Sequence, residues 1–225
     1  MRFIKLKLFT NQLEAELLFY TQTIGFELLS RSDNSFTVKI GWTALTFERA
    51  RQDYIYHYCF LIPSNQLQAA LSWLQEKTEL IKAPDGTIIQ HFEDWNADSF
   101  YFYDASGNIA ECIVRYDLEN QTAEDFDITQ FLCVNEMGMP TNDISTTNKL
   151  LEQGMKSSHW KGNFSRFSTH GSLEGMILLP NYEVKETWFP TSKKIKPQPF
   201  SAVIESTEKL YTLIFDGQQI DIDLL

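Results

Sequence analysis

Hydrophobic and polar residues follow two different periods in the first part of the chain. Residues 3–9 alternate apolar side chains with Lys5 and Lys7, the pattern of a strand with one buried face. From Asn11, which we expect to cap a helix, leucines recur at helical spacing until Gly25, a residue suited to end it. Short runs between turn residues predict three more strands, at residues 27–30, 36–40 and 43–48. The predicted order of this unit is βαβββ.

A second unit repeats that order. The phrase Asn-Gln-Leu-Glu-Ala-Glu-Leu at residues 11–17 returns as Asn-Gln-Leu-Gln-Ala-Ala-Leu at residues 65–71. The predicted elements are a strand at 57–62, a helix over 65–77, and strands at 88–92, 100–103 and 109–115. A repeated strand and helix at this period indicates a duplicated unit. We expect the two units to face each other and to enclose one shared cleft.

The remaining residues predict a further α+β segment. After a polar, acidic stretch at 117–127, the pattern predicts strands at 130–134, 164–169 and 175–179, a helix over 143–153, and strands at 200–205, 210–215 and 219–224. Residues 190–199 contain three lysines and three prolines, so we expect an exposed loop there. The expected organisation is a paired βαβββ domain over 1–117 and a C-terminal α+β domain over 118–225. The second domain is interpreted as a diverged copy of the same unit.

Composition narrows the functional classes. The formal net charge is −11, and neither half contains the basic stripe that a nucleic acid requires, so we expect no nucleic-acid partner. No apolar run approaches the roughly 18 residues of a membrane helix, and the N-terminus has a strand pattern instead of that of a signal peptide. Three cysteines without CxxC spacing fit a reducing compartment. We expect a cytoplasmic protein with no membrane partner.

The end of the second unit carries a family resemblance. Its sequence from Tyr103 to Glu111 is Tyr-Asp-Ala-Ser-Gly-Asn-Ile-Ala-Glu. Together with the paired βαβββ pattern, this resembles the vicinal oxygen chelate superfamily, which includes glyoxalases, extradiol dioxygenases and bleomycin-resistance-type binding proteins. Asp104, Gly107, Asn108 and Glu111 match the family's closing motif, whereas Ala105 replaces its usual proline. The resemblance implies a cup-shaped mixed sheet within an α+β fold.

The resemblance also implies candidate catalytic and metal-binding residues. His57 on the first strand and Glu111 on the last strand of the second unit occupy the family's ligand positions. An imidazole and a carboxylate suit a divalent Zn, Mn, Fe or Ni ion. The first unit departs from the pattern, with Lys5 and Ala44 at the matching places. The predicted metal site is therefore incomplete: we expect no resident cofactor, although a divalent metal stays an alternative.

Lys5 suggests a different role for the same carboxylate. An ammonium group beside Glu111 would compensate the desolvation of that carboxylate without any metal ion. The alternative for Lys5 and Lys7 is an exposed strand face with both amines in water. Both interpretations are left open by the sequence.

Other residues are candidates for binding a ligand in the cup. These are Lys5, Lys7, Glu48, His91, Tyr101 and Tyr103. His91 would serve as a general base or third metal ligand, against the alternative of a purely structural histidine. The aromatic content of 14% favours an apolar or aromatic ligand, although most of these rings belong to the core.

Three functional hypotheses follow. The preferred one is a glyoxalase-like or bleomycin-resistance-like protein that holds a small organic molecule beside an incomplete metal site. The second is a metal-dependent lyase, isomerase or dioxygenase. The third is a self-associating structural protein without a small-molecule site. Because both units lie in one chain, a monomer and a homodimer are both open.

Overall fold

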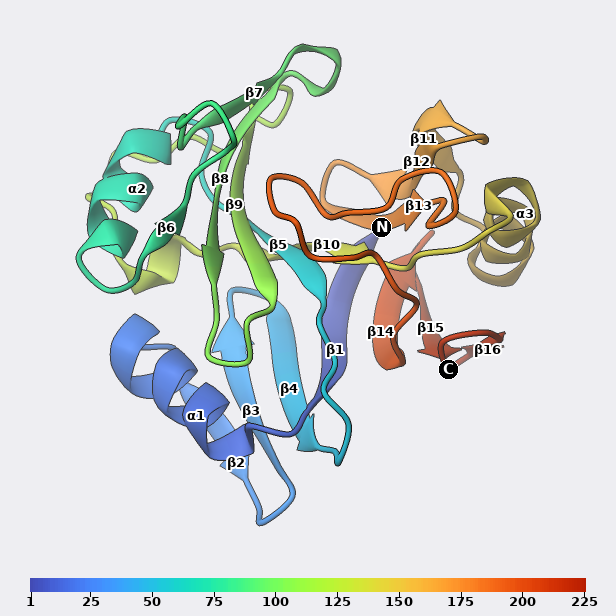
Figure 1. Ribbon diagram of the computed structural model, residues 1–225, viewed down its shortest axis with the longest axis horizontal. Helices are drawn as coiled ribbons and strands as arrows, with labels where there is room; N and C mark the ends of the chain where they lie inside the picture. The colour runs from blue at the N-terminus through green and yellow to red at the C-terminus, as the bar shows by residue number, and fades with distance from the viewer.

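The computed structural model describes residues 1–225 and shows two mixed β-sheets with three α-helices (Figure 1). The first unit contains β1 (Arg2–Thr10), α1 (Leu13–Leu18), β2 (Leu28–Arg31), β3 (Ser35–Ile40) and β4 (Thr43–Arg49). The second contains β5 (His57–Leu61), α2 (Leu67–Gln75), β6 (Leu80–Ile81), β7 (Gln90–Phe92), β8 (Ala97–Tyr103) and β9 (Ile109–Arg115). The α+β class and the repeated βαβββ units are therefore confirmed.

The C-terminal half contains a third unit and a three-stranded meander. The third unit consists of β10 (Cys133–Gly138), α3 (Ile144–Met155), β11 (His159–Asn163), β12 (Phe167–Ser172) and β13 (Gly175–Pro180). The meander consists of β14 (Phe200–Ser206), β15 (Lys209–Phe215) and β16 (Ile220–Leu224). Short helical turns occupy Phe19–Ile24, Glu93–Trp95 and Ile128–Gln130. The third unit has the βαβββ order of the first, as expected for a further copy, although common descent of the units stays a prediction.

The units pair differently from the expectation of one cleft between the first and second. The smaller sheet has the order β16-β15-β14-β1-β4-β3-β2, so the first unit joins the meander. The larger sheet has the order β11-β12-β13-β10-β5-β9-β8-β6, with β7 paired to β8, so the second unit joins the third. A division at residue 117 would thus separate strands that hydrogen-bond to each other within one sheet.

Burial patterns give a physical reason for this pairing. β1 and β14 both alternate between buried and accessible residues, as strands with one open face do. β5 and β10 are buried at every position, as strands covered on both faces are. Strands with the same kind of face thus lie side by side, and the two sheets share one core cluster of 41 buried residues.

The repeated Asn-Gln-Leu phrase does not cap its helices as predicted. Gln12 and Gln66, not Asn11 and Asn65, occupy the N-cap positions, and neither side chain caps the helix. Asn65 instead exchanges two hydrogen bonds with the backbone of Thr122, at 2.8 and 3.2 Å. The predicted end at Gly25 is confirmed, since this residue has a φ of 97° and ends the helical segment in the left-handed conformation.

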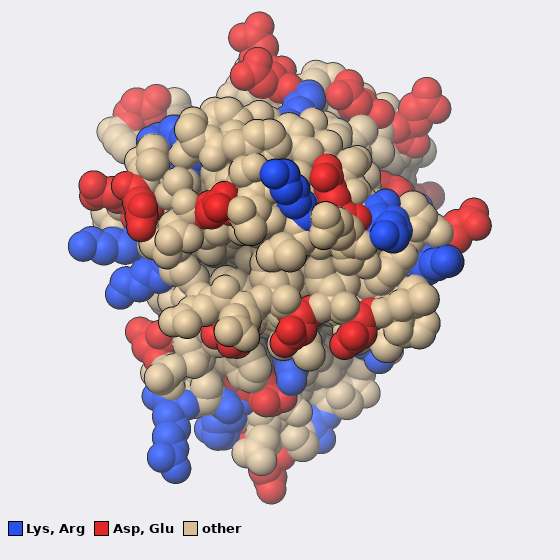
Figure 2. All heavy atoms as spheres, turned by 90° about the vertical axis from the view of Figure 1, so that its right-hand side faces the viewer, with Lys and Arg blue, Asp and Glu red and all other residues tan.

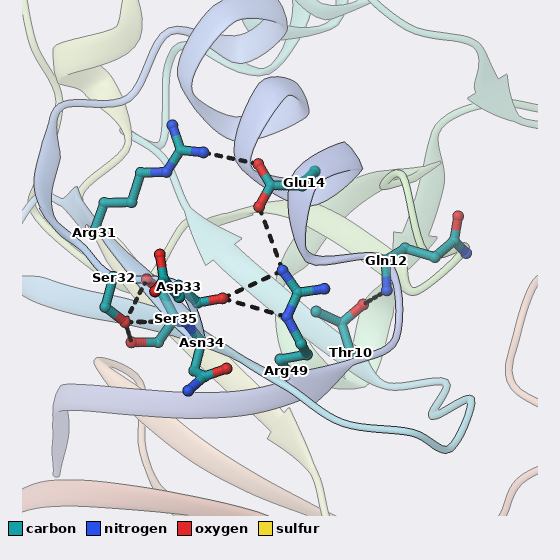
Figure 3. A network of polar contacts seen from close by, with 9 residues as sticks. All are labelled: Thr10, Gln12, Glu14, Arg31, Ser32, Asp33, Asn34, Ser35 and Arg49. Carbon is teal, nitrogen blue, oxygen red and sulfur yellow. Dashed lines mark hydrogen bonds and ion pairs between the residues drawn. The ribbon is translucent and has the colours of Figure 1, made fainter.

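The outer surface carries mixed charges. Near the start of α1, Glu14 pairs with Arg31 at the end of β2 and with Arg49 at the end of β4, which ties the helix to both strands (Figure 3). These exposed pairs contribute little to stability. On the face drawn in Figure 2, basic side chains are interspersed with acidic ones and form no continuous stripe. No helix has the length and apolar character needed to cross a membrane.

The β8–β9 turn, which carries the Asp-x-x-Gly-Asn motif, joins the second unit to the first. Asp104 accepts hydrogen bonds from the backbone of Ser106 and Asn108 at 3.1 and 2.8 Å, and also from the Tyr58 hydroxyl. The Ser106 amide donates to Glu16 of α1 at 3.1 Å. The motif therefore fixes a buried turn and docks it onto the first helix.

We expect Asp104→Ala to destabilise the protein by about 3 kcal/mol, because several buried donors would lose their acceptor. Urea unfolding followed by circular dichroism measures this change. Asp85→Ala is the matched control, because Asp85 organises a turn in the same way but is exposed. Equal effects of the two substitutions would show that burial of the Asp104 network adds nothing.

Candidate functional site

Three potential metal ligands meet on one face of the larger sheet. Their ligand atoms, from His57 on β5, Glu111 on β9 and Glu136 on β10, all lie within 4.8 Å of one another, and all three residues are buried. On β9, Ala110 and Cys112 belong to the main core cluster on the α2 side, so alternation points Glu111 to the opposite face. The three side chains therefore converge away from the helices.

His57 presents a free ring nitrogen to this cluster. Its Nδ1 lies 3.0 Å from the carbonyl oxygen of Ile109, which can only accept, so Nδ1 carries the proton. The unprotonated Nε2 lies 3.4 Å from Glu111 Oε2. Burial lowers the pKa of His57 to about 4, so the ring is neutral near pH 7. A neutral imidazole whose second nitrogen is fixed by a carbonyl is the form that binds a metal ion.

Glu111 and Glu136 are two buried carboxylates close to each other. Burial raises the pKa of Glu111 to about 8, and the nearby charge of Glu136 adds to this rise. Burial also raises the pKa of Glu136, and Arg115 acts in the opposite direction. The Arg115 guanidinium donates to Glu136 through Nη2 and to Asn135 Oδ1 through Nε, the latter at 2.9 Å. The charge of Arg115 thus acts to lower the pKa of both buried carboxyl groups.

A bulge in β10 aims Glu136 into the site. Opposite β5, Val134 pairs with Phe60 and Glu136 pairs with Cys59, so Asn135 is an extra residue in the ladder. In a regular strand, Glu136 would share the face of Val134, which belongs to the main core. The bulge moves it to the face of His57 and Glu111.

A cavity of about 260 Å³ adjoins the three ligands. Side chains of both paired units form its walls, among them Tyr101, Arg115, Phe167 and Leu178. Residues 181–199, which we call the roof segment, add Lys185, Trp188 and Phe189 (the orange-red loop of Figure 1). The expectation of an exposed loop at 190–199 holds in part, because Lys194 and Lys196 are exposed whereas Ile195 between them is buried.

Comparison with solved structures identifies the fold. A Bacillus subtilis protein provisionally assigned as a dioxygenase superposes with a TM-score of 0.63 at 13% identity, covering 100% of this chain and 84% of that one. Glyoxalase I from Zea mays superposes with a TM-score of 0.57 at 12% identity, covering 99% and 92%. The chain has the vicinal oxygen chelate fold. No family model and no curated protein sequence matches it.

Within this vicinal oxygen chelate fold, three of the predicted site residues line one cavity. These are His57, Tyr101 and Glu111. Tyr103, at the end of the same strand as Tyr101, is instead 37% exposed. Its ring makes a cation–π contact with the ammonium group of Lys193. His91 is exposed and pairs with Asp98 at 2.6 Å, so it does not reach the cluster.

The predicted residues of the first unit lie on the other sheet. Lys5 is an exposed residue of β1, and Lys7 pairs with Glu48 of β4 at 3.2 Å. The expected Lys5–Glu111 ion pair does not form, because β1 and β9 belong to different sheets. A buried cation does accompany the carboxylates, but it is Arg115.

Glu136, Arg115 and the roof segment are site components that the sequence did not predict. The strand predicted at 130–134 ended before Glu136, whereas β10 continues to Gly138. One clue was available: β10 begins the third unit as β5 begins the second, and the two strands carry Glu136 and His57. The bulge at Asn135 hides this correspondence from a simple alternation pattern.

The carboxylate cluster predicts a pH-dependent stability for chelator-treated protein. Because the pKa of Glu111 rises on folding from 4.5 to about 8, the folded state retains a proton that the unfolded state releases. Stability should therefore fall as pH increases from about 6.5 to about 7.5, by about 1 kcal/mol per pH unit. This window lies above the range in which His57 titrates, between its folded pKa of about 4 and its ordinary value of 6.5, and below the folded pKa of about 8 of Lys185.

Urea unfolding at several pH values checks this slope. Glu111→Gln is neutral at every pH and should flatten it, whereas Glu48→Gln, an exposed control on the other sheet, should leave it unchanged. A Glu111→Gln protein with the wild-type slope would show that Glu111 is not the responsible group.

Proposed function

We propose that this protein is a metal-dependent enzyme that acts on a small organic molecule in the cavity beside His57, Glu111 and Glu136. The observation that supports this most directly is the convergence of three buried ligand atoms, within 4.8 Å, at the wall of a cavity. One histidine and two carboxylates provide the three protein donors that catalytic metal sites commonly use. The third donor, Glu136, removes the main argument for an incomplete site.

The donor chemistry fits a divalent cation. His57 is neutral with Nε2 free, and Glu111 has a raised pKa because burial and a second carboxylate disfavour its charge. A bound cation would favour the ionised form of both carboxylates. Glu136 can keep Arg115 on one oxygen and offer the other to the ion. Arg115 then acts as an orienting partner of a ligand, as is common around metal sites.

The surrounding residues define what the chain contributes. When bound, a divalent ion supplies Lewis acidity toward an oxygen of the substrate. The Ile109 carbonyl fixes the orientation of the His57 ring, and Arg115 fixes that of Glu136. Tyr101, Phe167 and Trp188 exclude water from one side and offer apolar contact. This arrangement suits a lyase, isomerase or dioxygenase reaction on a substrate with adjacent oxygens.

A metal-free binding protein is the second candidate. The observation that favours it is the buried Arg115–Glu136 ion pair, in which a resident cation already compensates one carboxylate. In that case the cavity would hold a small organic molecule without chemistry, as in bleomycin-resistance-type proteins. All three cysteines are buried and free. With either candidate function, this supports a reducing compartment such as the cytoplasm.

Equilibrium dialysis against Zn²⁺, with elemental analysis, separates the two candidates. We expect one ion per chain, with His57→Ala and Glu136→Gln each weakening binding by more than about tenfold. His91→Ala is the matched control, because His91 also lies beside a carboxylate but is exposed and outside the cluster. Absence of a stoichiometric ion, or equal losses in the control, would favour the metal-free candidate.

A further inference from the structure

Two buried hydrogen-bond donors at the cavity have no partner within the protein. Trp188 is 3% exposed, and its Nε1 makes no hydrogen bond; Arg115 Nη1 is likewise buried and unpaired. Both side chains line the cavity. Leaving a buried donor unpaired is unfavourable, and more so for a charged group. Such donors point to an acceptor that a ligand would supply.

The position of Trp188 is fixed by the fold. Its ring lies 5.0 Å from the ring of His57, and its backbone is held in a turn by Lys193 and Thr191. Gly138, two residues after Glu136 on β10, leaves room for it: a Cβ at Gly138 would lie 2.6 Å from Trp188 Cη2. The strand that supplies the third ligand therefore also seats the tryptophan.

Lys185 adds a positive charge that no carboxylate neutralises. Its ammonium donates to the backbone carbonyl of Thr187 at 2.6 Å and makes no ion pair. Without a metal, its charge and that of Arg115 would balance ionised Glu111 and Glu136. A divalent ion would leave an excess of two positive charges in a largely buried site, which favours an anionic ligand.

The apolar walls limit the shape of that ligand. Aromatic rings lie on several sides of the cavity, contributed by Phe92, Trp95, Tyr101, Phe167 and Phe189. A volume of about 260 Å³ exceeds the roughly 150 Å³ of a cavity that holds benzene, so one ring with small substituents fits. Flat rings gain from edge and face contacts with such walls.

We propose that the cavity binds a small aromatic anion, and that Trp188 Nε1 and Lys185 Nζ position its anionic oxygens beside His57, Glu111 and Glu136. This inference rests on the proposed function, because it places the ligand next to the proposed metal. It makes Trp188 and Lys185 ligand-binding residues. It also gives the roof segment a role in choosing the substrate.

Calorimetric titration of Zn²⁺-loaded protein with 2-hydroxybenzoate tests the proposal. Trp188→Phe keeps the ring but removes the donor, and Lys185→Met removes the charge; each should weaken binding about tenfold, the equivalent of about 1.4 kcal/mol. Trp42→Phe, a substitution at the β3–β4 turn of the other sheet, should bind as wild type. The neutral analogue 2-hydroxybenzamide should bind more weakly than the acid and be insensitive to Lys185→Met.

Gly138→Ala provides a second variant that retains both donors. The added methyl group should displace the Trp188 ring and weaken 2-hydroxybenzoate binding as Trp188→Phe does. Far-ultraviolet circular dichroism checks that each variant is folded. Wild-type affinity in folded Trp188→Phe and Lys185→Met, or equal affinity for the acid and the amide, would overturn the proposal.

Titrations with and without Zn²⁺ keep this proposal distinct from the proposed function. If no ion binds but 2-hydroxybenzoate still depends on Trp188 and Lys185, the metal-dependent function fails and the anion site stands. If the ion binds to His57 and Glu136 but 2-hydroxybenzoate does not bind, the anion site fails and the metal centre stands.

Discussion

The antiparallel pairing of β5 with β10 is the contact on which the candidate site depends. It joins the second unit to the third and brings Glu136 beside His57 and Glu111. Pairing alone would not suffice, because a strand without an extra residue would direct Glu136 toward the core. The bulge at Asn135 places Glu136 on the face of His57 and Glu111. The side-chain oxygen of Asn135 also accepts a hydrogen bond from Arg115. One irregular residue thus positions both the third candidate ligand and its charged partner.

Charge balance links this geometry to function. Glu111 and Glu136 are buried together, and Arg115 is the cation that contacts one of them directly. Two carboxylates with one resident cation leave the site able to accept a further positive charge, which a divalent ion would supply. The same site then carries an excess of positive charge once Lys185 is included. The proposed metal binding and the proposed preference for an anion would therefore both result from one set of buried charges.

The two sheets show how a duplicated unit can divide its roles. In the smaller sheet, β1 presents Lys5 and Lys7 on an accessible face, where Lys7 pairs with Glu48 in an exposed setting. In the larger sheet, the corresponding face carries His57 and Glu111 and is closed by the roof segment. The first unit supports this arrangement through the docking of the Asp104 turn on α1.

Local pattern in the sequence determined the elements and the fold class, since hydrophobic alternation and turn residues act over a few positions. The family resemblance implied that His57 and Glu111 occupy one site, and the parallel pairing of β5 with β9 brings them together. Tertiary structure alone decided which units pair, and so placed Lys5 away from Glu111 and Glu136 close to it. Contacts in the tertiary structure also place residues 181–199 beside the cavity and pack Trp188 against Gly138. These outcomes depend on strand edges, a single bulge and contacts between residues far apart in the chain, which no local period encodes.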